Sequence, residues 1–326
     1  AVLGRFVSDL AVAAVGNNVP VFGLIISFCM GLSIGVNVVV ARALGMKNDQ
    51  KASEAVRTSF ITAIVFGIFA LLIGQAFANS AMDWLDVPEE VRDYALIYLR
   101  VYLLGMPFIA IYNFLAAVFR SQGDTQTPLW ALLIASLFNI GGNLFAVLVL
   151  DWGVAGVALA TALANLLSAV ILFVKLTHLD GPLKLEVSQL LKVDGASLKS
   201  IVRIGLPAGV QGAVYALSNL VIQSAINSLG PEAMAGSVAA FTIENSVYCF
   251  INAFALSATT FVSQNYGARN LERCSRVMWV TMGLNMCATV LLTAGVLLFC
   301  RDLLGIFSSN EEVLALGMIR ILWVLV

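Results

Sequence analysis

The sequence predicts an all-α integral membrane protein, and three observations lead to this prediction. Hydrophobic residues make up 60% of the 326 residues and charged residues only 11%, whereas soluble domains carry about 25% charged residues. Apolar runs long enough to cross a bilayer follow one another along the chain. Short motifs recur at a fixed distance, which predicts two pseudo-symmetric six-helix bundles in the full chain, with about nine to ten of the twelve helices in these residues.

Nine apolar segments reach or approach the length of a membrane span. They cover residues 11–44, 55–78, 91–119, 128–150, 154–177, 202–229, 233–266, 277–300 and 313–326. The break at residues 151–153 is so short that its neighbouring helices are predicted to form a tight antiparallel pair. Pro20, Pro107 and Pro207 lie inside segments, where each removes a backbone hydrogen bond. We predict bends at these prolines, either hinges that open a cavity or fixed kinks.

Basic residues indicate which ends of the segments face the cytoplasm. Thirteen of the 18 lysines and arginines lie in alternate loops, at residues 42–57, 120, 175–203 and 269–276, and the opposite loops are acidic. By the positive-inside rule the basic loops are cytoplasmic, so the chain is predicted to be a multi-pass membrane protein. The net charge of −1 and the lack of a basic run argue against a nucleic-acid partner.

Two motifs recur at an offset of 222 residues. Residues 85–91 (LDVPEEV) match residues 307–313 (FSSNEEV), and residues 45–48 (GMKN) match residues 267–270 (GARN). Such repeats are typical of transporters, and an even number of helices in each repeat leaves both halves in the same orientation. Two repeats predict about 444 residues and twelve helices. We therefore expect this chain to lack most of one helix at its start and about two and a half at its end.

The repeat predicts three regions. Residues 1–177 form a first lobe without most of its first helix, residues 178–200 form a cytoplasmic linker, and residues 201–326 form a second lobe without its last helices. Apolar and polar residues alternate in the linker between residues 183 and 193. This alternation predicts a short amphipathic segment lying on the cytoplasmic face.

Glu244 is an acid inside an apolar helix. It lies 12 residues after Glu232, or about 18 Å along a helix, near the middle of a hydrocarbon layer about 30 Å thick. A charge there costs roughly 2.5–3.5 kcal/mol, and intramembrane acids are functional by default. We predict that Glu244 binds the coupling ion or a cationic substrate; the alternative is a neutral, hydrogen-bonded structural acid.

Polar side chains accompany Glu244 on two predicted helices. Tyr248 and Asn252 continue its face toward the cytoplasmic end of the same helix. Gln211 and Tyr215 share a face of the preceding segment, and Tyr215 lies at a matching depth. Either side chain would hydrogen-bond the carboxyl and hold it neutral until an ion or a substrate arrives.

Several stretches have the pattern of a known family. They are residues 120–128 (RSQGDTQTP) followed by Asn139, residues 153–161 (GVAGVALAT), residues 205–207 (GLP) and residues 259–268 (TTFVSQNYGA). In these stretches the chain resembles the multidrug and toxic compound extrusion transporters. The resemblance implies two six-helix lobes around a central cavity, and export of bulky, often cationic organic compounds. It also implies coupling to inward H⁺ or Na⁺, with no cofactor and no metal apart from Na⁺.

The resemblance implies further site residues. The family pattern has an asparagine and, four residues later, an acid on the fifth helix, with a threonine on the sixth. Asn139 and Thr161 match this pattern, and Asn143 stands in the place of the acid. The first-helix acid of the family would lie before Ala1, and Tyr215 occupies the place where some members carry a glutamate. By this resemblance Asn139, Asn143 and Thr161 bind the ion or the substrate.

We therefore predict a secondary active transporter rather than an enzyme. It is expected to be a monomeric antiporter of the plasma membrane, the inner membrane of a bacterium, that moves small organic molecules by alternating access among membrane lipids. One alternative is a lipid-linked oligosaccharide flippase of the same superfamily, which would favour a cationic cavity. A second is a membrane-embedded enzyme, which would need a cluster of catalytic groups that the sequence does not reveal.

Overall fold

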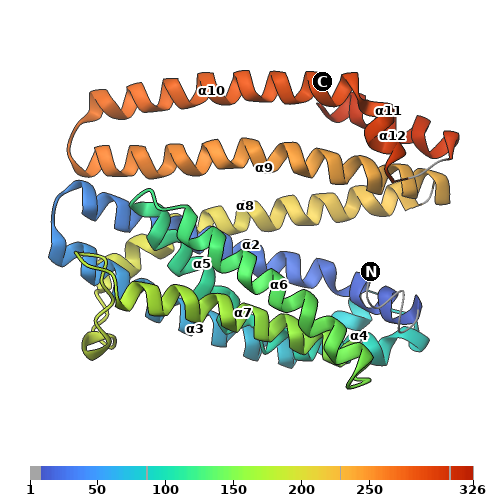
Figure 1. Ribbon diagram of the computed structural model, residues 1–326, viewed down its shortest axis with the longest axis horizontal. Helices are drawn as coiled ribbons and strands as arrows, with labels where there is room; N and C mark the ends of the chain where they lie inside the picture. The colour runs from blue at the N-terminus through green and yellow to red at the C-terminus, as the bar shows by residue number, and fades with distance from the viewer. Residues whose placement is uncertain (1–8, 86, 228, 308–309, 326) are drawn as a thin grey trace. The chain divides into compact units, whose positions relative to one another are not determined.

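The computed structural model describes residues 9–85, 87–227, 229–307 and 310–325, and these residues fold into helices joined by short loops and by one longer linker, residues 178–194 (Figure 1). The helices are α2 (Asp9–Gly45), α3 (Asp49–Trp84), α4 (Glu89–Leu103), α5 (Met106–Ser121), α6 (Gln126–Leu148), α7 (Gly153–Thr177), η1 (Val187–Gln189), α8 (Gly195–Asn227), α9 (Pro231–Gly267), α10 (Leu271–Leu298), α11 (Cys300–Gly305) and α12 (Glu311–Leu325). The chain divides into two compact units, residues up to 216 and residues from 217 on. The boundary lies inside α8 rather than in the linker, because the first half of α8 packs against α2 at Gly205 and Gly209.

Seven of the described helices are long and apolar enough to cross a membrane. The pair α4 and α5 qualifies as an eighth span that is bent by 45°. The ninth predicted segment corresponds to α12, which has 15 residues. The prediction of an all-α, multi-pass membrane protein is therefore confirmed.

The bend between α4 and α5 lies beside one of the predicted proline sites. Pro107 stands in the first turn of α5, where a missing N–H breaks no helical hydrogen bond. The segment is thus two helices separated at Leu104–Gly105, and a Cβ on Gly67 of α3 would lie 2.4 Å from the Pro107 Cα atom. Pro20 and Pro207 lie inside α2 and α8. A hinge function for the three prolines stays a prediction.

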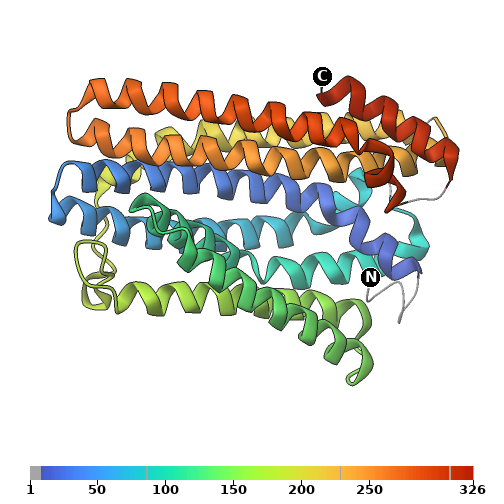
Figure 2. The same ribbon diagram turned by 45° about the horizontal axis from the view of Figure 1, so that its top comes forward.

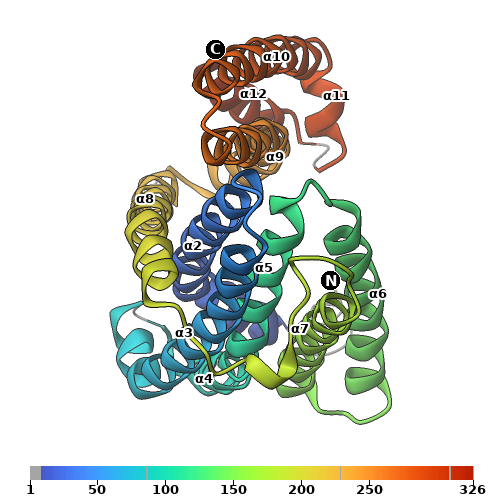
Figure 3. The same cartoon turned by 90° about the vertical axis from the view of Figure 1, so that its left-hand side faces the viewer.

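The first unit is a helical bundle in which α2 packs against α3, α4 and α5, and α7 packs against α4, α5 and α6 (Figure 3). Its apolar core includes the fully buried side chains of Phe114, Leu115 and Phe119 from α5. A second cluster gathers around Leu99 and Leu103 of α4. Alanines fill much of both clusters, so the helices approach one another closely.

The linker between α7 and α8 packs in part against the first unit. It is mostly non-helical, with the single 3₁₀ turn η1, and the Leu185 N–H donates a hydrogen bond to the Leu176 carbonyl oxygen at 3.1 Å. Leu183 and Leu185 are buried in the core of the first unit, whereas Leu191 is 89% exposed. The period-two alternation therefore packs the first part of the linker against the protein itself.

The repeated motif builds the same turn twice. Lys47 and Arg269 have positive φ angles of 52° and 58°. The next residue, Asn48 or Asn270, caps the following helix, because its side-chain oxygen accepts a hydrogen bond from the backbone N–H three residues later, at 2.9 Å and 3.0 Å respectively. The first copy joins α2 to α3 and the second joins α9 to α10. The internal repeat found in the sequence therefore has a matching structure at these turns.

In the second unit α9 packs lengthwise against both α10 and α12 (Figure 2). The α9–α12 contact is close at Gly236, where an added Cβ would lie 2.6 Å from the Val313 carbonyl oxygen. Ile243 and Val247 of α9 contribute to the buried cluster of this unit, together with Ile321 of α12. These close contacts position the charged site described next.

Candidate functional site

Glu244 forms an ion pair with Arg320 inside the second unit. Arg320 Nε donates a hydrogen bond to Glu244 Oε1 at 3.0 Å, and Arg320 Nη2 donates to Glu244 Oε2 at 3.2 Å. The Glu244 side chain is only 10% exposed and the Arg320 side chain 17%. Since both carboxylate oxygens accept bonds from one guanidinium, Glu244 is a paired carboxylate and not the neutral, hydrogen-bonded acid of the structural alternative.

Arg320 contacts a single face of α9. Arg320 Nη1 donates a hydrogen bond to the Ser237 hydroxyl oxygen, and the guanidinium carbon lies 5.6 Å from the centre of the Phe241 ring. Ser237, Phe241 and Glu244 are spaced by four and then three residues, which places them on successive turns of one helix face. The guanidinium is therefore held by a hydroxyl, an aromatic ring and a carboxylate from one helix.

The first repeat has an aromatic pair at the corresponding positions. Phe22 and Glu244 each lie 23 residues before the glycine that ends their helix, and Tyr98 and Arg320 each lie nine residues after the glutamate that begins theirs. The rings of Phe22 and Tyr98 are 5.9 Å apart. In the first repeat the polar link between these helices comes from Asn18 Nδ2, which donates to the Ala95 carbonyl oxygen at 2.9 Å. The packing of this helix pair therefore does not require a buried ion pair.

The other residues predicted around Glu244 are spread over two helices. Tyr248 and Asn252 follow Glu244 on α9; Tyr248 is exposed and Asn252 is half-buried. Gln211 and Tyr215 are exposed residues of α8 that belong to the first unit. A contact between them and Glu244 would join the two units and stays a prediction.

The three residues implied by the family pattern lie together in the first unit. Asn139 Nδ2 donates a hydrogen bond to Thr161 Oγ1 at 3.1 Å, and Asn143 Nδ2 donates to Asn139 Oδ1 at 3.0 Å. Thr161 Oγ1 in turn donates to the Val157 carbonyl oxygen at 2.9 Å. The Asn143 Oδ1 atom is buried and accepts no hydrogen bond from the described residues. This amide chain is uncharged and presents one unsatisfied acceptor.

The tight turn between α6 and α7 brings these residues together. Trp152 N–H donates to the Ala146 carbonyl oxygen at 3.0 Å, and both Asp151 and Gly153 have positive φ angles. Antiparallel helices joined by so short a turn place residues at equal distances from it opposite one another. Asn139 and Thr161 each lie 11 residues from position 150. The predicted antiparallel pair is confirmed, and it explains their contact.

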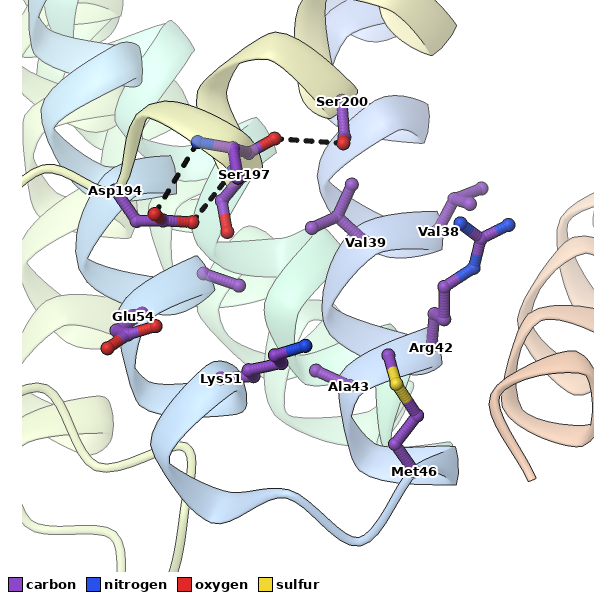
Figure 4. A pocket seen from close by; sticks show the side chains of 12 residues that line it. Val38, Val39, Arg42, Ala43, Met46, Lys51, Glu54, Asp194, Ser197 and Ser200 are labelled. Carbon is purple, nitrogen blue, oxygen red and sulfur yellow. Dashed lines mark hydrogen bonds between the residues drawn. The ribbon is translucent and has the colours of Figure 1, made fainter.

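A pocket of about 280 Å³ lies where the linker enters α8 (Figure 4). Its charged lining residues are Arg42, Lys51, Glu54 and Asp194, two basic and two acidic. The side chain and the backbone N–H of Ser197 hydrogen-bond the Asp194 carboxylate and hold its pKa below the usual value. Opposite charges thus balance in this pocket, and Asp194 serves as the cap of α8.

Arg320 is the site residue that the sequence analysis missed. It stands between Ile319 and Ile321 in an apolar stretch, nine residues after Glu311, or about 13 Å along a helix. The argument applied to Glu244 also applies to this cation, because a charge at such a depth needs a partner. The signal for their pairing in the sequence was that each is a lone charge in an apolar helix and that the two charges are opposite.

The fold and the site define a polytopic α-helical membrane transporter with an internal repeat, rather than an enzyme. The chain belongs to the MatE family, whose profile matches residues 1–145 and 207–326. It is 28% identical over 324 residues to the probable multidrug resistance protein YoeA of Bacillus subtilis, covering 96% of this chain and 69% of that protein. It is 26% identical to the probable multidrug resistance protein NorM of Thermotoga maritima, covering 97% and 68% respectively.

A solved structure shares the fold. It is described as the outward-facing conformation of a multidrug resistance MATE family transporter of the MOP superfamily. The TM-score is 0.86 at 23% sequence identity, covering 98% of this chain and 72% of that chain. This similarity confirms the predicted fold class.

Proposed function

We propose that this protein is a cation-coupled antiporter that exports bulky, often cationic organic compounds across the plasma membrane. Membership of the MatE family and the names of the two multidrug resistance relatives support export of such compounds. The carboxylate of Glu244 supports coupling, because a charge at membrane depth is costly and marks an ion or substrate pathway. The proposed mechanism is alternating access, in which the protein opens a central cavity to one side of the membrane at a time.

The observation that carries the proposal is the ion pair at the position where the first repeat has an aromatic pair. The contact between Phe22 and Tyr98 packs the corresponding helices without a buried ion pair. Since burying two charges costs several kcal/mol per ion, a role in transport explains the retention of Glu244 and Arg320 better than packing does. In the first unit the free Asn143 Oδ1 atom offers an uncharged acceptor to a substrate N–H or O–H group.

The experiment is export of a cationic dye from membrane vesicles, with a pH gradient and a Na⁺ gradient imposed separately. We expect one of the two gradients to drive export and Glu244→Gln to abolish the response. Glu232→Gln, in the first turn of the same helix, is the matched control and should respond like the wild type. Export by Glu244→Gln at the normal rate would contradict the assignment of Glu244. No response of the wild type to either gradient would contradict the antiporter.

The second candidate is a flippase for lipid-linked oligosaccharides, and Arg320 is the observation that bears on it. A guanidinium in a membrane helix would suit an anionic lipid headgroup. However, both oxygens of Glu244 already neutralise this guanidinium. Export independent of both gradients, together with flipping of an anionic lipid in the same vesicles, would favour the flippase.

A further inference from the structure

The carboxylate of Glu244 is already occupied by a cation that belongs to the protein. Two of the five N–H donors of Arg320 bind the two carboxylate oxygens, and a third binds Ser237. The side chains are 10% and 17% exposed, so little water reaches the pair. An incoming cation that uses Glu244 as its anionic partner therefore meets a site that is electrically neutral.

We propose that Arg320 is a resident competitor, which holds Glu244 in place of the transported or coupling cation and must leave before that cation binds. This inference rests on the proposed function and assigns a specificity-determining residue to the same site. The guanidinium has two other contacts on α9, the Ser237 hydroxyl and the Phe241 ring. These two groups still bind the guanidinium when another cation takes its place at the carboxylate.

Arg320 is released when α12 moves away from α9 far enough to break its two hydrogen bonds to Glu244. A bidentate pair weakens steeply once its donor and acceptor atoms separate beyond hydrogen-bonding distance. The backbones of the two helices approach closely at Gly236 and Gly317, eight residues before Glu244 and three before Arg320, where a Cβ on Gly317 would lie 3.1 Å from the Gly236 carbonyl oxygen. The occupancy of Glu244 is therefore linked to the spacing of these two helices.

The test is equilibrium binding of tetraphenylphosphonium, a permanent cation, to the intact purified protein in detergent without any gradient. Arg320→Gln leaves the carboxylate without its internal cation, and we expect binding to tighten by about ten-fold or more. Arg320→Lys keeps a cation and should stay near the wild-type affinity. The double variant Glu244→Gln with Arg320→Gln should lose the gain, because its acceptor is uncharged. A purely structural role for Arg320 would not produce this pattern.

Unchanged or weaker binding by a folded Arg320→Gln protein would overturn the proposal, as would an equal gain in the double variant. If Arg320→Gln does not fold, Glu244→Asp replaces it, since a shorter carboxylate weakens the pair and retains both charges. That variant should bind the cation more tightly than the wild type, and no gain would overturn the proposal. Failure of gradient-driven export in vesicles, with the binding pattern intact, would contradict only the proposed antiport.

Discussion

Transplanting the aromatic pair of the first repeat into the second tests whether the ion pair has a packing role. The change is Glu244→Phe combined with Arg320→Tyr, the residues present at Phe22 and Tyr98. Each single substitution leaves one buried charge without its partner, at 10% or 17% side-chain exposure. Breaking a buried pair in this way costs about 3–5 kcal/mol, whereas replacing both partners by apolar groups is often neutral or stabilises by about 1–4 kcal/mol.

The assay is thermal unfolding in detergent of the wild type, both single variants and the double variant. At roughly 2–4 °C per kcal/mol, we expect each single variant to lower the apparent Tm by about 6 °C or more and the double variant to return to the wild-type value or above it. The two substitutions should therefore be strongly non-additive. Additive losses, or a double variant no more stable than either single variant, would refute the view that an aromatic pair can replace these charges.

Three further sets of substitutions test the packing, the amide chain and the repeat. Gly67→Ala places a Cβ 2.4 Å from the backbone of α5 and should cost about 1–3 kcal/mol of stability. Gly141→Ala, whose Cβ would have nothing within 4 Å, should be neutral or stabilise the protein by up to about 1 kcal/mol. Equal melting temperatures for the two variants would contradict this difference. Asn139→Ala breaks two side-chain hydrogen bonds, so it should cost about 1–2 kcal/mol of stability and weaken dye binding. A variant with wild-type stability and dye affinity would argue against a role of this amide chain in stability and binding. Asn48→Ala and Asn270→Ala should each cost about 0.5–2 kcal/mol, and clearly unequal losses in thermal unfolding would show that the two caps are not equivalent.

The helices and their turns could be predicted from the sequence because local signals determine them. The run from Pro231 to Gly267 is predominantly apolar despite Glu244, and it forms one continuous helix. The position of Pro107 indicated the bend within the third segment (residues 91–119), although this proline lies in the first turn of a new helix instead of kinking one. The alternation in the linker was recognised, but the burial of Leu183 and Leu185 depends on a distant core that no local pattern reveals.

The candidate site was only partly predictable, for a related reason. Asn139 and Thr161 share a short hairpin, so their contact follows from their distances to the turn. Glu244 and Arg320 are 76 residues apart on helices joined through α10 and α11. Pairing them needs the packing of α9 against α12, which the sequence alone does not determine. The 222-residue repeat offered the missing register, since it aligns this contact with that between Phe22 and Tyr98.

The two matching turns have a consequence for how the protein enters the membrane. Lys47 and Arg269 adopt a left-handed conformation that costs a side-chain-bearing residue about 1–2 kcal/mol, and a glycine would avoid this cost. Both copies nevertheless have a cation at this point, and by the positive-inside rule such a cation is expected to hold its loop in the cytoplasm. Each repeat is therefore expected to bring its own orientation signal to the insertion machinery.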